Sequence, residues 1–273
     1  MSSDRGLHAA AGQQVSADAY DRYIGRWSRL FVPSLLTAAE VGAGDQVLDV
    51  ATGTGEASIA AIPIIGDDGV VIGADISAAM LGAACDRLPR SYRAIVTDGQ
   101  ALAFQDASFD AVVSQLGLMF FPDPARGLAE FRRVLRHGGC AAVCVISTPE
   151  KAPMRGVLAE TLSRHLPEQR EALHFSFSLA QCPRLEAMLG AAGFREVKVT
   201  RETRYGIVES FDEYWAAIEA GRRTAALNLF VTSRTGAASS ARRGASGAVA
   251  VREKWAVGDD RRDADRSRSS LKE

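Results

Sequence analysis

The chain has 273 residues, 47% of them hydrophobic, which is enough to bury one substantial core with some residues left over. Its formal net charge is −1 and its pI is near 6.5, so it lacks the basic surface with which proteins hold nucleic-acid phosphates. Its N-terminal residues show no apolar segment of a secretory signal, and no apolar run approaches the roughly 18 residues of a membrane helix. We therefore expect a cytoplasmic protein with no nucleic-acid partner and no membrane span.

Patterns typical of strands and helices alternate along most of the chain. A first helix, which Pro33 is expected to divide, precedes an apolar strand, and further apolar runs then alternate with helical periodicity. Continuous apolar strands between helices are typical of a parallel sheet covered on both faces, so the sequence predicts a doubly wound α/β fold. His137-Gly138-Gly139 is expected to end the fourth helix. The expected strands cover residues 47–50, 70–74, 92–96, 111–114, 141–146 and 196–203; the expected helices cover residues 19–39, 57–65, 77–88, 125–135, 184–192 and 211–221.

The four cysteines and the four histidines indicate neither a disulfide framework nor a metal site. The cysteines lie in apolar or helical segments, as the free thiols of a reducing compartment do. The histidines show no metal-ligand spacing, so we expect no bound metal. His174, in the HFSFS segment, could act as a base near a substrate, although a surface histidine is the simpler interpretation. The residues concerned are Cys85, Cys140, Cys144, Cys182, His8, His137, His165 and His174.

The segment VLDVATGTGE, residues 47–56, joins the first strand directly to a glycine-rich turn. Gly53 and Gly55 carry no Cβ, so a ligand can approach the main chain there. Asp49 lies near the end of this strand, Asp75 ends the second strand, and Asp98 follows the third. Because the carboxyl ends of parallel strands face one crevice, we expect these three carboxylates to converge on one ligand. Asp75 lies 20 residues after Gly55, a spacing that suits hydrogen bonds to ribose hydroxyls.

These motifs resemble those of the class I S-adenosylmethionine (SAM) methyltransferases, and in particular their ubiquinone/menaquinone-biosynthesis (UbiE-like) branch. The resemblance rests on D-x-A-x-G-x-G, on GADISAAML, and on the run from TDGQALAF to RVLRHGG; it covers about residues 20–147 and reaches Trp215 more loosely. His137 stands where the family usually has proline. The resemblance implies transfer of a methyl group from SAM to carbon, oxygen or nitrogen of a small-molecule acceptor, such as a quinone precursor or a secondary metabolite.

By motif position, the resemblance also implies which residues bind the cofactor. The glycine turn would surround the methionine end of SAM, and Asp75 would hold the ribose. Apolar side chains after Asp75 would lie beside the adenine, and the third acidic motif would meet the adenine amino group. The resemblance identifies no catalytic base. The implied cofactor-binding residues are Asp49, Ala51, Thr52, Gly53, Thr54, Gly55, Asp75, Ile76, Met80, Asp98, Gly99 and Gln115.

Each carboxylate also has a simpler interpretation. Asp49 could cap the next helix or hold the turn, Asp75 could be the N-cap of the following helix, and Asp98 with Gly99 could form an ordinary Asp-Gly turn. Two further segments could face a ligand or merely pack. They are Met119-Phe120-Phe121 after the fourth strand, and a possible N-terminal lid that contains Tyr20, Tyr23, Arg26 and Trp27.

Two rival functions remain at the level of the sequence. An NAD-dependent oxidoreductase shares the strand–turn–helix and the ribose carboxylate, but Ala51 replaces its first glycine, Ser58 ends the pattern, and Asp98 has no role there. The other rival is a SAM-fold protein that no longer catalyses a reaction, which the unusual C-terminal tail would suggest.

We expect residues 1–18 to be a flexible N-terminus, residues 19–228 to be the methyltransferase domain, and residues 229–273 to be a low-complexity, disordered tail. Ser, Arg, Ala, Gly and Asp dominate the tail, and its periodicity disappears. The family usually ends its sheet with an antiparallel strand, whereas residues 251–266 consist mainly of charged side chains. We therefore expect that strand to be missing or altered, and we hypothesise a frameshift near residues 229–235. Sequencing the gene and finding no continuation of the family pattern in a shifted frame would disprove it.

Overall fold

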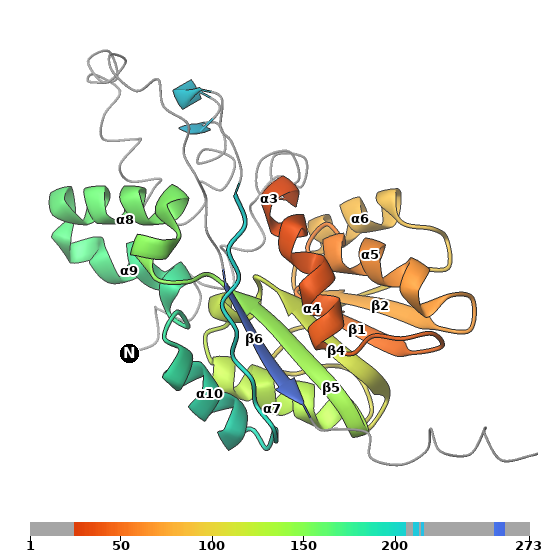
Figure 1. Cartoon of the computed structure of the whole chain (residues 1–273). Coiled ribbons are helices and arrows are strands. Elements are labelled where there is room, and N and C mark those ends of the chain that lie inside the picture. The colour runs from red at the N-terminus through yellow and green to blue at the C-terminus, as the bar shows by residue number, and fades with distance from the viewer. Residues whose placement is uncertain (1–24, 206–209, 213, 216–253, 260–273) are drawn as a thin grey trace, which may run out of the picture.

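The computed structural model describes residues 25–205, 210–212, 214–215 and 254–259. Its centre is a sheet made of strands β1 (Gln46–Val50), β2 (Val70–Asp75), β3 (Arg93–Val96), β4 (Phe109–Gln115), β5 (Leu135–Val145) and β6 (Lys254–Asp259). Their order in space is β3-β2-β1-β4-β5-β6. Strands β1 to β5 run parallel, and β6 pairs antiparallel with β5 at the edge (Figure 1). The doubly wound α/β fold that the sequence predicted is confirmed.

Helices cover both faces of this sheet. Helices α4, α5 and α6 lie on one face, and α7 and α10 lie on the other (Figure 1). Proline occupies one of the first two positions of α4, α7, α8 and α10, where the missing amide hydrogen costs no helical hydrogen bond. The helices are α3 (Arg26–Ser28), α4 (Val32–Ala38), α5 (Glu56–Ile65), α6 (Ala78–Arg87), α7 (Pro124–Val134), α8 (Pro153–His165), α9 (Arg170–His174) and α10 (Cys182–Ala191). The 3-10 helices are η2 (Arg29–Phe31), η3 (Leu118–Phe120), η4 (Pro149–Lys151), η5 (Pro167–Gln169) and η6 (Phe175–Phe177).

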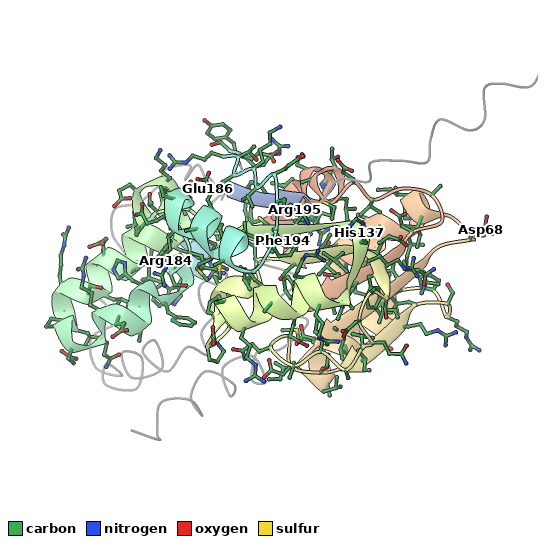
Figure 2. All side chains as sticks on the ribbon, turned by 90° about the horizontal axis from the view of Figure 1, so that it is seen from below. Asp68, His137, Arg184, Glu186, Phe194 and Arg195 are labelled. Carbon is green, nitrogen blue, oxygen red and sulfur yellow. The ribbon has the colours of Figure 1, made fainter. Side chains whose placement is uncertain are left out.

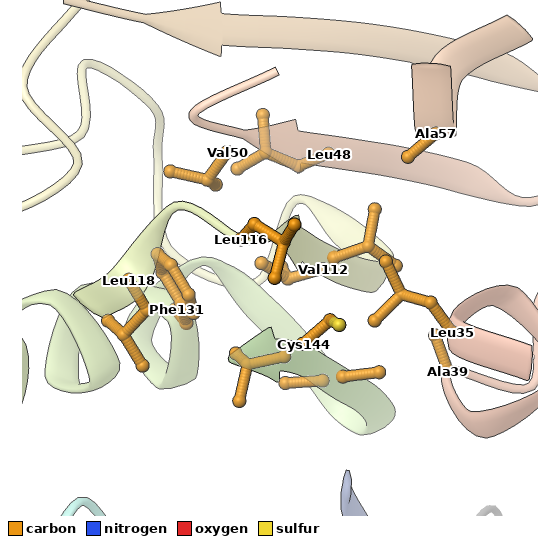
Figure 3. Packing of buried hydrophobic residues seen from close by; sticks show 14 of the residues in the cluster. Leu35, Ala39, Leu48, Val50, Ala57, Val112, Leu116, Leu118, Phe131 and Cys144 are labelled. Carbon is orange, nitrogen blue, oxygen red and sulfur yellow. The ribbon is translucent and has the colours of Figure 1, made fainter. Parts of the chain in front are cut away.

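The core lies between the sheet and its two helix layers. Leu35 of α4 and Phe131 of α7 reach it from opposite layers, and Leu48 and Val112 reach it from the central strands (Figure 3). All four side chains have no measurable exposure. The Phe131 ring packs edge-on against Phe121, with 6.2 Å between the centroids. Burial on both faces explains why the strands read as continuous apolar runs.

The first helix of the sequence prediction is divided as expected. The chain changes from α3 through η2 into α4, and Pro33 lies at the start of α4. No helix within the described part of the chain is long and apolar enough to span a bilayer.

The prediction that His137-Gly138-Gly139 ends the fourth helix is wrong. Helix α7 ends at Val134, and the three residues form an irregular stretch inside β5, whose exposed His137 is labelled in Figure 2. Leu135 pairs with Phe109, whereas Cys140 pairs with Ala111, so β5 bulges between these pairs. Gly138 has φ +79°, and a Cβ on Gly139 would lie 2.8 Å from the Asp110 carbonyl oxygen. Glycine is therefore needed here to let the strand bulge.

Two predictions about the far edge of the sheet also differ from the structure. Residues 196–203 form no strand, and only Lys198 makes an isolated bridge; the strand beside β5 is β6. The closing antiparallel strand is not missing: β6 supplies it from the stretch that read as charge. Of the helix expected over residues 211–221, the structure describes a helical turn at 211–212 and 214–215. Residues 1–18, and all of the tail except β6, lie outside the described residues.

Candidate active site

The candidate site lies at the carboxyl ends of the parallel strands, beside the point where the strand order reverses between β1 and β4. The chain leaves β1 through a turn in which Ala51, Gly53 and Gly55 have φ values of +57°, +56° and +86°. The Thr52 amide donates to the Ala74 carbonyl at 3.1 Å, which ties the turn to β2. A left-handed conformation costs an L residue such as Ala51 about 1–2 kcal/mol, so neighbouring contacts must hold the turn.

The two glycines of the turn have different surroundings. A Cβ built on Gly53 meets no atom within 4 Å, so the main chain there borders open space. A Cβ on Gly55 would lie 2.7 Å from Leu88 Cδ1 and 3.3 Å from Ala84 Cβ of α6. Gly53 therefore leaves bare main chain for a ligand, and Gly55 allows α6 to pack against the turn.

Asp49 lies fully buried behind this turn. Its Oδ2 accepts hydrogen bonds from the Thr52 hydroxyl at 2.7 Å, the Ser58 hydroxyl at 2.7 Å and the Ser58 amide at 3.1 Å. Its Oδ1 is buried with no hydrogen-bond partner. Burial raises the pKa of Asp49 from 3.8 to about 6, and the hydrogen bonds from Thr52 and Ser58 oppose this shift. Asp49 thus holds the turn onto α5, as the simpler interpretation of the sequence had it, and lies away from the open side of the turn.

Asp75 is half-buried at the end of β2, and its two oxygens bind different segments. Oδ2 accepts from the Gly53 amide at 2.9 Å, and Oδ1 accepts from the Ser77 amide at 2.9 Å. Burial raises the pKa of Asp75, and both amide hydrogen bonds oppose the shift. The N-cap of α6 is Ser77, whose hydroxyl accepts from the Met80 amide at 3.4 Å. Asp75 is therefore not the N-cap, and it joins the turn to the end of the neighbouring strand.

Asp98 follows β3 and is exposed. Its carboxylate accepts from the main-chain amide of Gln100 at 2.9 Å and from the side-chain amide of Gln100 at 3.1 Å. Gln100 Oε1 in turn accepts from the Asp123 amide at 2.7 Å, which links this loop to the start of α7. A Cβ on the buried Gly99 would collide with the ring of Phe121. Asp98 and Gly99 therefore form a packed turn whose carboxylate still faces solvent.

The remaining predicted residues surround these groups. Ile76 is 37% exposed directly after Asp75, whereas Met80 is buried. Gln115 ends β4; its Nε2 donates to the Ser28 carbonyl of α3 at 2.8 Å, and its Oε1 has no hydrogen-bond partner. The structure therefore gathers Gly53, Asp75 and Ile76 at the ends of β1 and β2, and places Asp98 at the end of β3.

Sequence reasoning missed three residues that support the turn. Ser58 binds Asp49, the Tyr92 hydroxyl lies 3.5 Å from Thr52 Oγ1, and Arg87 Nη1 donates to the Thr54 carbonyl at 2.9 Å. Spacing along the chain gave no signal for Tyr92 or Arg87, because their partners come near only in the folded protein. Within the residues that the structure describes, no group of three or more His, Cys, Asp or Glu side chains could hold a metal ion.

Comparisons with known proteins agree with this geometry. Residues 48–143 match the family model described as a methyltransferase domain. The ubiquinone/menaquinone biosynthesis C-methyltransferase UbiE of Xylella fastidiosa is 33% identical over 204 residues, which are 69% of this chain and 79% of that protein. A demethylmenaquinone methyltransferase of a Mycobacterium species is 35% identical over 137 residues, which are 50% of this chain and 56% of that protein. The YcgJ protein of Bacillus subtilis has a similar fold, with a TM-score of 0.59 and 21% identity over 85% of this chain and 98% of its own.

The fold and the family match make this protein a SAM-dependent methyltransferase. The chain is at least 30% identical to UbiE enzymes and covers about four fifths of their length, so it belongs to the UbiE family of these enzymes. Its cofactor is accordingly SAM. None of the matches favours the two rivals, an NAD-dependent oxidoreductase or a SAM-fold protein without activity.

Alanine substitutions at the two glycines should separate ligand binding from folding. Gly53→Ala adds a methyl group to open space and should weaken SAM binding about tenfold or more, with only the backbone strain of about 1–2 kcal/mol in stability. Gly55→Ala should lower stability further, because the methyl group overlaps Leu88 and overpacking costs about 1–3 kcal/mol more. Titration calorimetry with SAM and urea unfolding of each variant measure the two effects. Equal losses of stability in both variants would contradict the difference between the two positions.

The buried carboxylate of Asp49 should make stability depend on pH. Its pKa is about 6 in the folded protein and 3.8 ordinarily, so between these values the folded state binds the proton more tightly. This contribution to stability is complete below about pH 3.8 and is lost as the pH rises to about 6, by roughly 3 kcal/mol. Asp49→Asn lacks the titration, so the stability of the wild type relative to this variant should fall across that interval. Melting temperatures from pH 4 to pH 7 test it, with the exposed Asp68→Asn as control. Parallel curves for wild type and Asp49→Asn would disprove the assignment.

Proposed function

We propose that this methyltransferase transfers the methyl group of SAM to a ring carbon of a small aromatic acceptor of the quinone-precursor class. The observation that carries the cofactor side of the proposal is the open main chain at Gly53 directly beside the half-buried carboxylate of Asp75. The acceptor class is supported by the relatives, because a UbiE enzyme is matched over 79% of its length.

The cofactor would lie across the carboxyl ends of β1, β2 and β3. Each oxygen of Asp75 already accepts one amide hydrogen bond, and each keeps acceptor capacity for a ribose hydroxyl. The exposed Ile76 offers an apolar surface for a flat base, and the exposed carboxylate of Asp98 can accept from an amino group. Met80 and Gly99, which are buried, would pack beneath the residues that contact the nucleoside. These features fit a nucleoside that carries hydroxyl and amino donors.

The methionine end would lie along the turn, at main-chain atoms of residues 51–55. A sulfonium and an amino group are cationic, and the carboxylate of Asp75 suits them better than an anion-binding helix terminus would. Thr54 Oγ1 and Gln115 Oε1 are polar atoms without hydrogen-bond partners near this end. Asp49 would act through the turn and not by contact, because it is fully buried.

Bound SAM supplies a methyl group that is already activated by its sulfonium, so the chain has to position the two reactants and exclude water. The fixed turn and Asp75 set the place of the donor. An acceptor that carries a hydroxyl group must also lose a proton when its ring carbon is methylated, which requires a base.

Removal of the Asp75 carboxylate should weaken cofactor binding. Asp75→Ala should raise the Kd of SAM about tenfold to a hundredfold, which corresponds to losing about 1–3 kcal/mol of hydrogen bonding. Titration calorimetry measures the change, and circular dichroism confirms that the variant is folded. Asp68→Ala, which removes an exposed carboxylate between α5 and β2, is the matched control. An unchanged Kd in folded Asp75→Ala would remove the ribose assignment.

The proposed reaction is tested first by ligand-dependent melting and then by turnover. Saturating SAM should raise the melting temperature of the full chain, and NAD should not. Methyl-labelled SAM should then transfer label to a chemically reduced demethylmenaquinone analogue with a short side chain. Mass spectrometry should place the new methyl group on a ring carbon. A protein that binds SAM but labels only oxygen or nitrogen, or that labels no such acceptor, would contradict the proposed acceptor class.

A further inference from the structure

The order of the strands divides the carboxyl edge of the sheet into two halves. Apart from Gln115, which ends β4, the proposed SAM residues lie at the ends of β3, β2 and β1, and the ends of β4 and β5 lie on the other side of β1. The chain that follows β5 forms η4, α8, η5, α9 and η6 before it reaches α10. It returns to the end of β4 at η6, which contacts η3, and the Ser178 hydroxyl donates to the Met119 carbonyl at 3.3 Å. The segment from η4 to η6 therefore lies at the half of the edge where the methyl acceptor, and not SAM, would bind.

Aromatic side chains from both segments meet at this contact. Phe120 ends η3, the short helix after β4, and Phe175 begins η6; their ring centroids are 6.4 Å apart and the rings are tilted by 40°. Phe120 is 40% exposed, which is unusual for a large apolar side chain. An exposed ring beside a second ring offers a flat apolar surface, on which an aromatic acceptor can stack.

His174 is the last residue of α9 and directly precedes Phe175 in the chain. Its ring centroid is 5.9 Å from that of Phe177, and its side chain is 20% exposed. Its Nε2 lies 3.4 Å from Glu160 Oε1 of α8, and the same Glu160 oxygen is 3.3 Å from Arg170 Nη2. Nε2 is buried and makes no hydrogen bond, so Glu160 acts on the imidazole through its charge. A nearby carboxylate favours a proton on the nitrogen that faces it, which leaves the other nitrogen as an acceptor.

A second carboxylate, that of Glu150 in η4, interacts electrostatically with His174. The Thr148 hydroxyl lowers the pKa of Glu150 in η4 by hydrogen bonding, and the charge of His174 acts in the same direction. The charged groups around the imidazole are therefore Glu150, Glu160 and Arg170. Of the other histidines that the structure describes, His137 is exposed near the start of β5 and His165 is exposed at the end of α8.

We propose that His174, beside the charge of Glu160, is the general base of the reaction, and that it deprotonates a hydroxylated aromatic acceptor stacked against Phe120 and Phe175. This inference rests on the proposed function and adds the acceptor site to it. The acceptor O–H bond breaks and its proton passes to the unprotonated ring nitrogen of His174. The ring carbon next to the oxygen then forms a bond to the methyl carbon as the methyl–sulfur bond breaks, which leaves a neutral thioether. Loss of the ring hydrogen as a proton to solvent restores the aromatic ring as a phenolate, whose oxygen takes back the proton held by His174. One methyl group is therefore gained and one proton is released in total.

Substitution of the imidazole should affect turnover and not cofactor binding. His174→Gln should lower kcat for the reduced demethylmenaquinone analogue about a hundredfold to ten-thousandfold, with an unchanged Kd for SAM. The wild-type rate should rise with pH as the base loses its proton, and His174→Gln should lack that rise. Added imidazole should restore part of the rate of His174→Ala. His137→Gln, at the opposite end of β5, is the matched control and should keep wild-type rates.

Two further variants separate the partners of His174. Phe175→Leu should raise the KM for the acceptor several-fold with little change in kcat, because it removes stacking surface. Glu160→Gln should lower kcat less than His174→Gln does, because the imidazole remains and loses only the neighbouring charge. A folded His174→Gln that keeps wild-type kcat and pH dependence would overturn the assignment of His174 as the base and leave the proposed function standing. A wild-type protein that binds SAM but methylates no such acceptor would overturn the proposed function and this assignment with it.

Discussion

A carboxylate that is fully buried and bonded through only one of its oxygens holds the main chain in place at the active edge of this enzyme. Asp49 Oδ2 accepts hydrogen bonds from two hydroxyl groups and one amide, and these bonds fix the turn after β1 to the first turn of α5. Burial makes its charged form costly, as the rise of its pKa to about 6 shows. The left-handed residues of the turn depend on this bonding, and so does the amide of Gly53 that reaches Asp75. The open main chain at Gly53 therefore depends on a carboxylate that is itself fully buried.

Ion pairs extend this support to the elements on either side of the turn. Glu56, the first residue of α5, lies 2.7 Å from Arg87 of α6 and 3.3 Å from Arg29 of η2. Arg87 also donates to the Thr54 carbonyl, and Gln115 of β4 donates to the carbonyl of Ser28. The turn is thus joined to the helix that follows β2 and to the N-terminal helices that reach the same edge. Such an arrangement lets a nucleoside half and an acceptor half be built from separate segments around one rigid centre.

Most of the fold could be predicted from the sequence, because its local signals agree with one another. The apolar runs mark β1 to β5 to within a few residues for most strands, Pro33 divides the first helical segment, and Gly193, with φ +91°, lies just beyond α10. The edge of the sheet was predicted poorly. Residues 196–203 carry an alternating pattern but form no strand, and β6 comes from a stretch that reads as charge. At an edge, a strand is decided by which segment reaches the neighbouring backbone, and composition records that only weakly.

By itself the sequence determined the order of strands and helices, the glycine turn, and the set of acidic residues that end successive strands. These are local properties, fixed by periodicity and by which residues tolerate unusual backbone angles. Only the tertiary structure decided that Asp49 faces inward while Asp75 stays half-exposed, since both end apolar strands in the same way. It also decided that His174 lies beside Glu160 of α8 and Phe177 of η6. The reason is that side-chain surroundings depend on contacts between residues far apart in the chain, and these exist only once the sheet and its helices have packed.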